Sequence, residues 1–140
     1  MSTGAPDVLR ELFRNEHAVV VIDDDLGLVR MIRSDVPLRT EEEVDTLYHA
    51  VALAVPRVDR RGLAVLVDLR RSPARNDEAF EAQQAQHRNA AFGGYRRGAA
   101  LVRSAAGKLQ ITRLAREHKQ PTPVFNDEAE ALAYLARRRG

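Results

Sequence analysis

The sequence has no cysteine and no tryptophan, and aromatic residues make up only 5% of its 140 residues. The absence of cysteine excludes disulfide bonds, thiolate zinc sites and a cysteine nucleophile. No apolar run approaches the roughly 20 residues that a membrane-spanning helix needs. The first residues, MSTGAPDVLRELFRNE, include early acids and no continuous apolar segment. We therefore expect no secretory signal and no membrane span, and a cytoplasmic location.

Lysine is almost absent as well, because Lys108 and Lys119 are the only lysines among 22 basic residues. Such an arginine-rich chain suits recognition of phosphate by the planar guanidinium group. The composition of a GC-rich genome produces the same excess, and we favour that explanation. Charged residues make up 30% of the chain and hydrophobic residues 44%, with a net charge of +2. These values are typical of an ordinary globular chain, long enough to bury a core in one domain.

Short apolar and polar patterns organise the first part of the chain. Residues 1–16 are expected to form a tail, with a short helix over residues 8–14. The β-branched run at 17–22 and the alternating run LVRMIR (Leu28–Arg33) predict two strands. The intervening DDDLG is a turn, in which glycine can adopt a positive φ angle. The two strands therefore predict a β-hairpin.

Helix and strand signals alternate through the rest of the chain. Thr40 and Glu43 have capping-box spacing and open a helix that Pro56 ends. The continuously apolar segment 62–68 predicts a central strand that is covered on both faces. Further helices are predicted over 76–92, 105–118 and from 126 onward, with strands at 98–103 and 123–125. The order β-β-α-β-α-β-α-β-α predicts an α/β fold with a mostly parallel sheet, as a single domain over residues 17–138.

An unusually polar segment follows the apolar central strand. It reads DLRRSPARNDEAF and leads into the alanine-rich helix NDEAFEAQQAQHRNAAF. Such a helix gains little hydrophobic energy, so it is either a thinly buried surface helix or a docking face for a partner or a second copy. We predict that the loop and helix at 70–92 form a contact surface. The candidate residues are Arg70, Arg71, Ser72, Arg75, Asn76, Asp77 and Phe80.

The strand ending in VDL, the polar loop with its helix, and the closing segment VFNDEAEALAYL resemble a known family. They are similar to the STAS domains, the SpoIIAA-like fold of bacterial anti-anti-sigma factors, with a looser likeness to the lipid-binding Sec14 domain. The resemblance covers residues 17–136. It implies successive strand–helix units with helices mainly on one face. It also implies a non-enzymatic role in signal transduction, in which the domain binds a protein partner such as an anti-sigma kinase.

The sequence departs from this family at the regulatory position. In STAS domains a phosphorylated serine lies in an Asp-Ser-Ser-Gly-like turn at a helix N-terminus. The matching turn here is NDEA at 76–79, so that Asp77 stands in the place of the serine and the glycine is missing. A carboxylate supplies part of the charge of a phosphate but not its oxygen atoms. We therefore expect no phosphoserine switch here, and we interpret Ser72, which precedes Pro73, as part of a rigid turn.

A response-regulator receiver domain is the main alternative. VVVIDDDLG resembles the acidic pocket of a receiver, and VDLRRSP resembles its phosphoacceptor segment, so Asp24 and Asp68 would meet around magnesium. Three observations count against this alternative. Leu28–Arg33 alternates like a strand where a receiver needs a helix, the acidic stretch suits a hairpin turn, and no lysine follows the last strand.

Other binding functions have weaker support. A small anionic ligand would suit the predicted helix N-termini at Asn76 and Ser104, with Arg75 and Arg103 nearby, although Asp77 would repel an anion. Nucleic-acid binding is disfavoured because the basic residues form no stripe and acids are distributed along most of the chain. These basic residues are Arg96, Arg97, Arg103, Lys108, Arg113 and Arg116.

Catalysis is not expected. The four histidines are scattered without metal-ligand spacing, and the carboxylates have no evident nucleophile or base as a partner. They are His17, His49, His87 and His118. We accordingly predict no cofactor and no metal.

Overall fold

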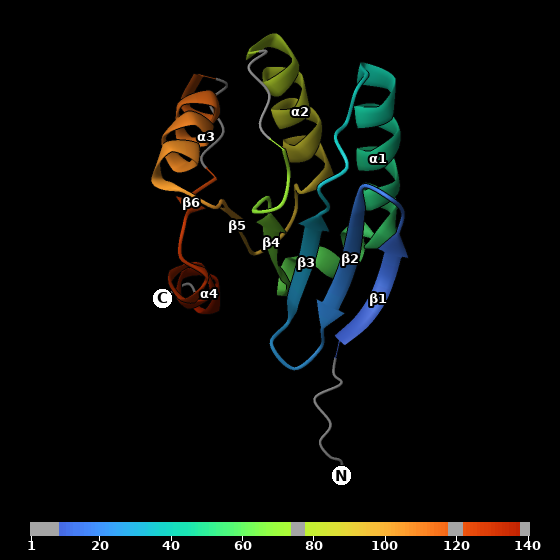
Figure 1. Cartoon of the computed structure of the whole chain (residues 1–140). Coiled ribbons are helices and arrows are strands. Elements are labelled where there is room, and N and C mark those ends of the chain that lie inside the picture. The colour runs from blue at the N-terminus through green and yellow to red at the C-terminus, as the bar shows by residue number, and fades with distance from the viewer. Residues whose placement is uncertain (1–8, 74–77, 118–121, 138–140) are drawn as a thin grey trace.

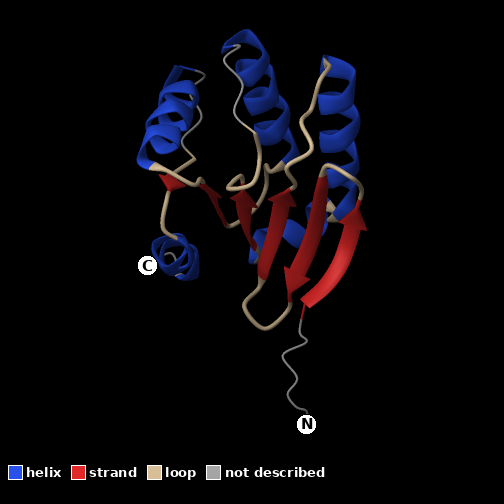
Figure 2. Cartoon of the chain, viewed as in Figure 1, coloured by secondary structure: helices blue, strands red, loops and turns tan. Residues whose placement is uncertain are grey.

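The chain folds around one mixed β-sheet that is covered by helices (Figures 1 and 2). This is a computed structural model of residues 1–140, and the structure describes residues 9–73, 78–117 and 122–137. The strands lie in sequence order across the six-stranded sheet. They are β1 (Leu9–Arg14), β2 (Ala18–Asp23), β3 (Leu28–Arg33), β4 (Ala64–Asp68), β5 (Arg97–Leu101) and β6 (Val124–Phe125).

The first strand takes the place of the helix that the sequence predicts over residues 8–14, so that prediction was wrong. β1 pairs antiparallel with β2 and has an irregularity between Glu11 and Phe13. Its apolar spacing suits a turn of helix, but the neighbouring strand offers backbone hydrogen-bond partners, and this pairing outweighs a weak local propensity. The predicted N-terminal tail therefore contains the edge strand of the sheet.

The predicted hairpin is confirmed. β2 and β3 pair antiparallel in continuous register from Ala18↔Arg33 to Asp23↔Leu28. Gly27 in the connecting turn has a φ angle of 63°, which glycine adopts without steric cost. Its carbonyl oxygen accepts a hydrogen bond from the Ala64 amide at 2.9 Å. The hairpin turn is thereby joined to the start of the central strand β4.

The rest of the sheet is parallel, so the predicted α/β class is confirmed. The pairs β3–β4, β4–β5 and β5–β6 are all parallel. Their connections pass through the helices α1 (Glu41–Ala54), α2 (Glu78–Ala91) and α3 (Ala105–Glu117). Because the strand order advances in one direction and such crossovers are right-handed, these helices lie on one side of the sheet (Figure 1). The last helix, α4 (Glu128–Ala136), packs on the other side.

The helix caps follow the sequence pattern. The Thr40 hydroxyl accepts a hydrogen bond from the Glu43 amide at 3.1 Å, as the capping-box spacing predicts. At the start of α4, the Asp127 carboxylate accepts one from the Glu130 amide, also at 3.1 Å. The NDEA segment at 126–129 therefore opens a helix as predicted. At the other end of a helix, Gly94 lies just beyond α2 and has a φ angle of 92°.

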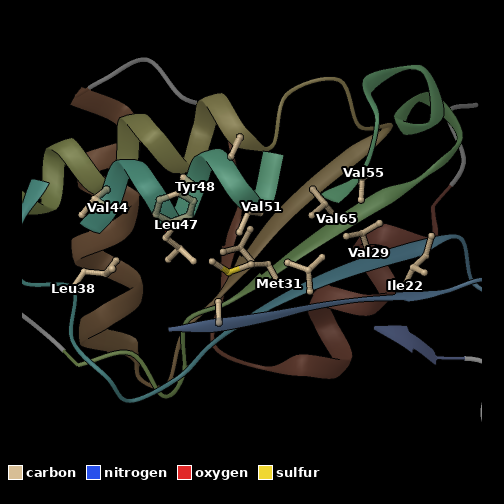
Figure 3. Packing of buried hydrophobic residues seen from close by; sticks show 14 of the residues in the cluster. Ile22, Val29, Met31, Leu38, Val44, Leu47, Tyr48, Val51, Val55 and Val65 are labelled. Carbon is tan, nitrogen blue, oxygen red and sulfur yellow. The ribbon is translucent and has the colours of Figure 1, made fainter. Parts of the chain in front are cut away.

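The larger part of the core lies between α1, α2 and the sheet (Figure 3). Val44, Leu47 and Val51 project from one face of α1 towards the sheet, as their helical spacing predicts. Met31 on β3 and Val65 on β4 are fully buried opposite them. Each such side chain contributes about 1.5–3 kcal/mol to the free energy of unfolding. This packing makes the central strands a rigid support for the loops at their ends.

A smaller apolar cluster joins the opposite face of the sheet to α4. Ala131 and Leu135 of the helix pack against Leu28, Leu66 and Leu101 of three neighbouring strands. Every residue of β4 is buried, because its side chains alternate between this cluster and the larger one. In the described part of the chain, no helix has the length and apolar character needed to cross a membrane.

A buried arginine ties two helix ends together in the larger core. Arg60 lies in the 3-10 turn η1 (Arg57–Gly62) and is only 1% exposed. Its guanidinium donates hydrogen bonds to carbonyl oxygens at the ends of α1 and α2, at distances from 2.6 to 3.1 Å. The acceptors are the carbonyls of Ala52, Val55, Ala91 and Gly93. Arg60 therefore satisfies backbone groups that a helix end leaves without partners.

Candidate interaction surface at the carboxyl end of β4

The polar loop begins as a direct continuation of the buried strand β4. The Leu69 amide donates to the Leu101 carbonyl of β5 at 2.8 Å, so that the sheet pairing extends one residue past the strand. The Ser72 amide then donates to the Leu69 carbonyl at 3.1 Å, which closes a tight turn. The start of the loop is therefore fixed by backbone hydrogen bonds.

Asp68, the last residue of β4, fixes the conformation of Arg70. Its carboxylate accepts hydrogen bonds from Nε of Arg70 at 3.0 Å and from Nη2 at 2.8 Å, a bidentate arrangement. The same carboxylate accepts the Arg70 backbone amide at 3.0 Å. Asp68 is buried, whereas the Arg70 side chain is 40% exposed. Arg70, predicted as a contact residue, thus holds the base of the loop while its side chain remains partly exposed.

The network extends from Asp68 to the N-terminus of α4. Nη2 of Arg70 also lies 3.0 Å from Oε1 of Glu128. The other oxygen of Glu128 accepts a hydrogen bond from Nη2 of Arg30, on β3, at 3.0 Å. Two carboxylates and two guanidinium groups therefore alternate along a chain of ion pairs. It connects β3, β4 and α4, which are distant in sequence.

The charges in this network shift the pKa values of its acids. Burial acts to raise the pKa of Asp68, but the hydrogen bonds from Arg70 and the charges of Arg70 and Arg30 outweigh it and lower that pKa. The pKa of Glu128 is lowered mainly by its hydrogen bond from Arg30. The hydrogen bond to Asp68 raises the pKa of Arg70. All of these groups therefore keep their charges at neutral pH.

Ser72 is held on the other side of the loop by a second buried arginine. Arg33, at the end of β3, is only 1% exposed. Its guanidinium donates to the carbonyls of His17 and Val36, both at 3.0 Å, and to the Ser72 hydroxyl at 3.3 Å. This contact agrees with the interpretation of Ser72 as part of a rigid turn.

The remaining predicted contact residues differ in their accessibility. Arg71 is exposed at the head of the loop, as a contact residue must be. Phe80, by contrast, is buried in the larger core cluster, so it positions α2 and does not present its ring to a partner. Arg75, Asn76 and Asp77 lie outside the described residues. Of these predicted contact residues, Arg71 is therefore accessible to a partner and Phe80 is not.

The aspartates of the receiver alternative do not come together. Asp24 lies in the hairpin turn at the amino end of β3, where Arg10 pairs with it at 2.7 Å. Asp68 lies at the carboxyl end of β4, which runs parallel to β3. The length of a five-residue strand, about 16 Å, separates these ends. The magnesium cluster of Asp24 and Asp68 that the receiver alternative requires therefore does not form. No group of acids and histidines suited to a metal ion occurs among the described residues.

At the start of α3, where the small-ligand alternative places an anion, two of the backbone amides are already bonded within the helix. The Ser104 hydroxyl accepts the Gly107 amide at 3.1 Å, and the Ser104 carbonyl accepts the Lys108 amide at 2.9 Å. Ser104 therefore caps its own helix. Arg103 is exposed beside it. The other predicted N-terminus, at Asn76, falls outside the described residues.

Arg30, Arg33 and Glu128 were missed as site residues by reasoning from the sequence. Arg30 and Arg33 occupy positions in the alternating strand that the sequence marks as polar, which is a weak signal on its own. In the sequence, Glu128 indicates no more than a favourable negative charge at a helix N-terminus. It lies in the first turn of α4, and it also pairs with two arginines. Only the strand register reveals these partners.

Comparisons with protein-family models, with curated proteins and with solved structures find no match for this chain.

Proposed function

We propose that this chain is a non-enzymatic regulatory module that binds a protein partner through the loop and helix at 70–92. The observation that supports this best is the fixed base of an exposed, basic loop. Arg70 is held by Asp68 and Glu128 on one side, and Ser72 is held by Arg33 on the other. The described part of the loop, residues 69–73, is held in this way before binding, so it loses less conformational entropy when a partner docks.

The charge of the loop favours an acidic partner surface. Arg71 is exposed, and Arg75 adds a further positive charge in the sequence of the same loop. Guanidinium groups form planar, bidentate hydrogen bonds with carboxylates, which gives such a contact its specificity. The partner in this proposal is therefore a protein that presents aspartate or glutamate side chains to the end of the sheet.

The resemblance to STAS domains supports a more specific form of the proposal. In that form, the chain acts in bacterial cytoplasmic signalling, and its partner is an anti-sigma-type kinase or a related regulator. Because Asp77 stands where the family has a phosphorylated serine, binding does not depend on phosphorylation at that position. The domain is then either locked in one signalling state or has kept the binding surface without the switch.

The test is a pull-down of the tagged full chain from its host lysate, quantified by mass spectrometry. We expect a partner captured by the wild type to be lost with Arg71→Glu, and also with Arg75→Glu. Arg61→Glu is the matched control, because Arg61 is an exposed arginine in η1, at the amino end of β4.

The outcomes of this pull-down separate three possibilities. Loss of one protein in the loop variants but not in Arg61→Glu supports the proposed surface. Capture of the same proteins by every variant contradicts it. If the chain captures only its own copies, and size-exclusion chromatography shows a dimer that Arg71→Glu dissociates, then the surface is a homodimer contact instead.

A further inference from the structure

A second feature of the structure lies beneath the helix α2. A cavity of about 180 Å³ is lined by α2, by the turn that follows it and by the strands β4 and β5. Its floor is apolar, formed by Val65 and Val67 of β4 together with Gly98 and Ala100 of β5. An added Cβ atom at Gly98 would lie 3.3 Å from a methyl group of Val65. The absence of a side chain at Gly98 therefore keeps this part of the floor open.

Arg88 of α2 lines the cavity and is 8% exposed. None of the residues that the structure describes forms a hydrogen bond or an ion pair with its guanidinium group. The side chain of the preceding residue, His87, instead lies 3.7 Å from Asp45 of α1. Arginine is rarely buried to this extent without a partner, because moving a charge out of water is costly unless an opposite charge or hydrogen-bond acceptors replace the water.

The rest of the lining indicates which partner the guanidinium group would take. A carboxylate matches the planar fork of arginine with two parallel hydrogen bonds. Among the described residues, Asn89 and Thr122 are the other polar residues of the lining. A phosphate dianion would need more positive charge and would make little use of the apolar floor. Arg88 is the one cationic residue among the described residues of the lining, and a cation above an apolar floor suits a monocarboxylate with an apolar tail.

The volume of the cavity limits the size of such a ligand. A protein cavity of about 150 Å³ holds one benzene molecule. The space beneath α2 is slightly larger, so it suits a ligand of about six to nine non-hydrogen atoms. Benzoate and butyrate are compounds of this kind, with a carboxylate at one end and a hydrocarbon group at the other.

We propose that the cavity beneath α2 binds a small organic monocarboxylate, with Arg88 holding the carboxylate and β4 and β5 contacting the apolar tail. This site is distinct from the loop surface and does not depend on the proposed protein partner. The two proposals are tested by different variants, so that one can fail while the other holds.

The first experiment is an NMR titration of the full chain with benzoate and with butyrate. The neutral controls are benzamide and butyramide, which have nearly the same shape but no charge. We expect saturable shifts of the Gly98 and Ala100 backbone amide signals with the carboxylates, and weaker binding of the amides by about ten- to a hundredfold. If the carboxylates cause no saturable shifts, or if the amides bind equally well, the proposal is overturned.

The second experiment uses variants of the guanidinium group. Arg88→Met keeps an unbranched apolar stem but removes the guanidinium group and its charge, and we expect it to abolish benzoate binding. Arg88→Lys keeps the charge without the planar fork, and we expect it to remain folded and to bind benzoate more weakly. Arg61→Met, at an exposed arginine, is the matched control and should bind like the wild type. Wild-type affinity in both Arg88 variants would overturn the role assigned to Arg88.

Discussion

Arg60 and Arg88 are both buried arginines near the core, but their surroundings differ. Arg60 donates hydrogen bonds to carbonyl oxygens at the ends of α1 and α2, and it also stacks 5.1 Å from the centre of the Tyr95 ring. Arg88 lines a cavity and has no partner among the described residues. Burial alone therefore does not distinguish a structural arginine from a binding residue.

The difference lies in how each guanidinium group is compensated. Arg60 replaces its lost water with backbone carbonyls that would otherwise be unsatisfied, so it stabilises the fold. Arg88 is 8% exposed and has no such acceptor among the described residues, so we expect it to contribute little to the stability of the unliganded chain. Substitution of these arginines should therefore have different effects on the free energy of unfolding.

The largest effect is expected for Arg60→Met. This change leaves the carbonyls of Ala52, Val55, Ala91 and Gly93 without their donor. Because each buried unsatisfied group costs about 1–3 kcal/mol, we expect the free energy of unfolding to fall by about 3 kcal/mol or more. Arg60→Lys should restore little, since an ammonium group cannot reproduce the planar fork. Urea unfolding measures both changes, and a loss below about 1 kcal/mol for Arg60→Met would contradict the structural role.

An intermediate effect is expected at the ion-pair network below the loop. Asp68→Asn removes the charge from a buried bidentate pair with Arg70, which should lower the free energy of unfolding at neutral pH by about 2 kcal/mol. Glu128 remains available to Arg70 in this variant, which limits the loss. Chemical unfolding at neutral pH measures the difference.

The same pair predicts a dependence of stability on pH. The pKa of Asp68 is lowered in the folded chain, because the hydrogen bonds and charge of Arg70 outweigh the opposing effect of burial. The pair therefore stabilises the fold above the unfolded-state pKa of about 3.9, and this stabilisation is lost as the pH falls through the lower folded-state value. We expect the Tm of the wild type to drop more steeply below about pH 4 than that of Asp68→Asn. Parallel acid profiles would contradict this assignment.

The sequence predicted the elements whose signals are local. The hairpin of β2 and β3, the capped start of α1 at Thr40, the buried strand β4 and the capped start of α4 were all predicted from patterns of a few residues. The strand β1 was not, because its charged pattern LRELFR becomes a strand only through pairing with β2. Its conformation is decided by a neighbour and not by its own propensity.

The candidate sites were harder to predict because they depend on register and packing. Arg30 and Glu128 are separated by 98 positions in the chain, and only the parallel order of the strands brings α4 back to β3. Similarly, the sequence marks Arg88 as one more polar residue on an alanine-rich helix. Its burial beside a cavity follows from how α2 lies on β4 and β5, which no local pattern encodes.

The smallest effect on stability is expected for Arg71→Glu. The side chain is exposed and takes no part in the ion pairs of Asp68, Arg70 and Glu128. We expect the free energy of unfolding to change by less than about 0.5 kcal/mol. Thermal unfolding of this variant should therefore match the wild type, so that any lost partner in the pull-down reflects the surface. A large loss of stability would show instead that Arg71 supports the fold.

The most direct test compares urea unfolding of the wild type, Arg60→Met and Arg88→Met, each with and without benzoate. We predict that Arg60→Met is less stable than the wild type, whereas Arg88→Met is at least as stable and gains up to about 1 kcal/mol. Benzoate should stabilise the wild type and Arg60→Met by mass action and leave Arg88→Met unchanged. If Arg88→Met loses as much stability as Arg60→Met, or benzoate stabilises all of the proteins equally, Arg88 is a structural residue and the cavity is not its binding site.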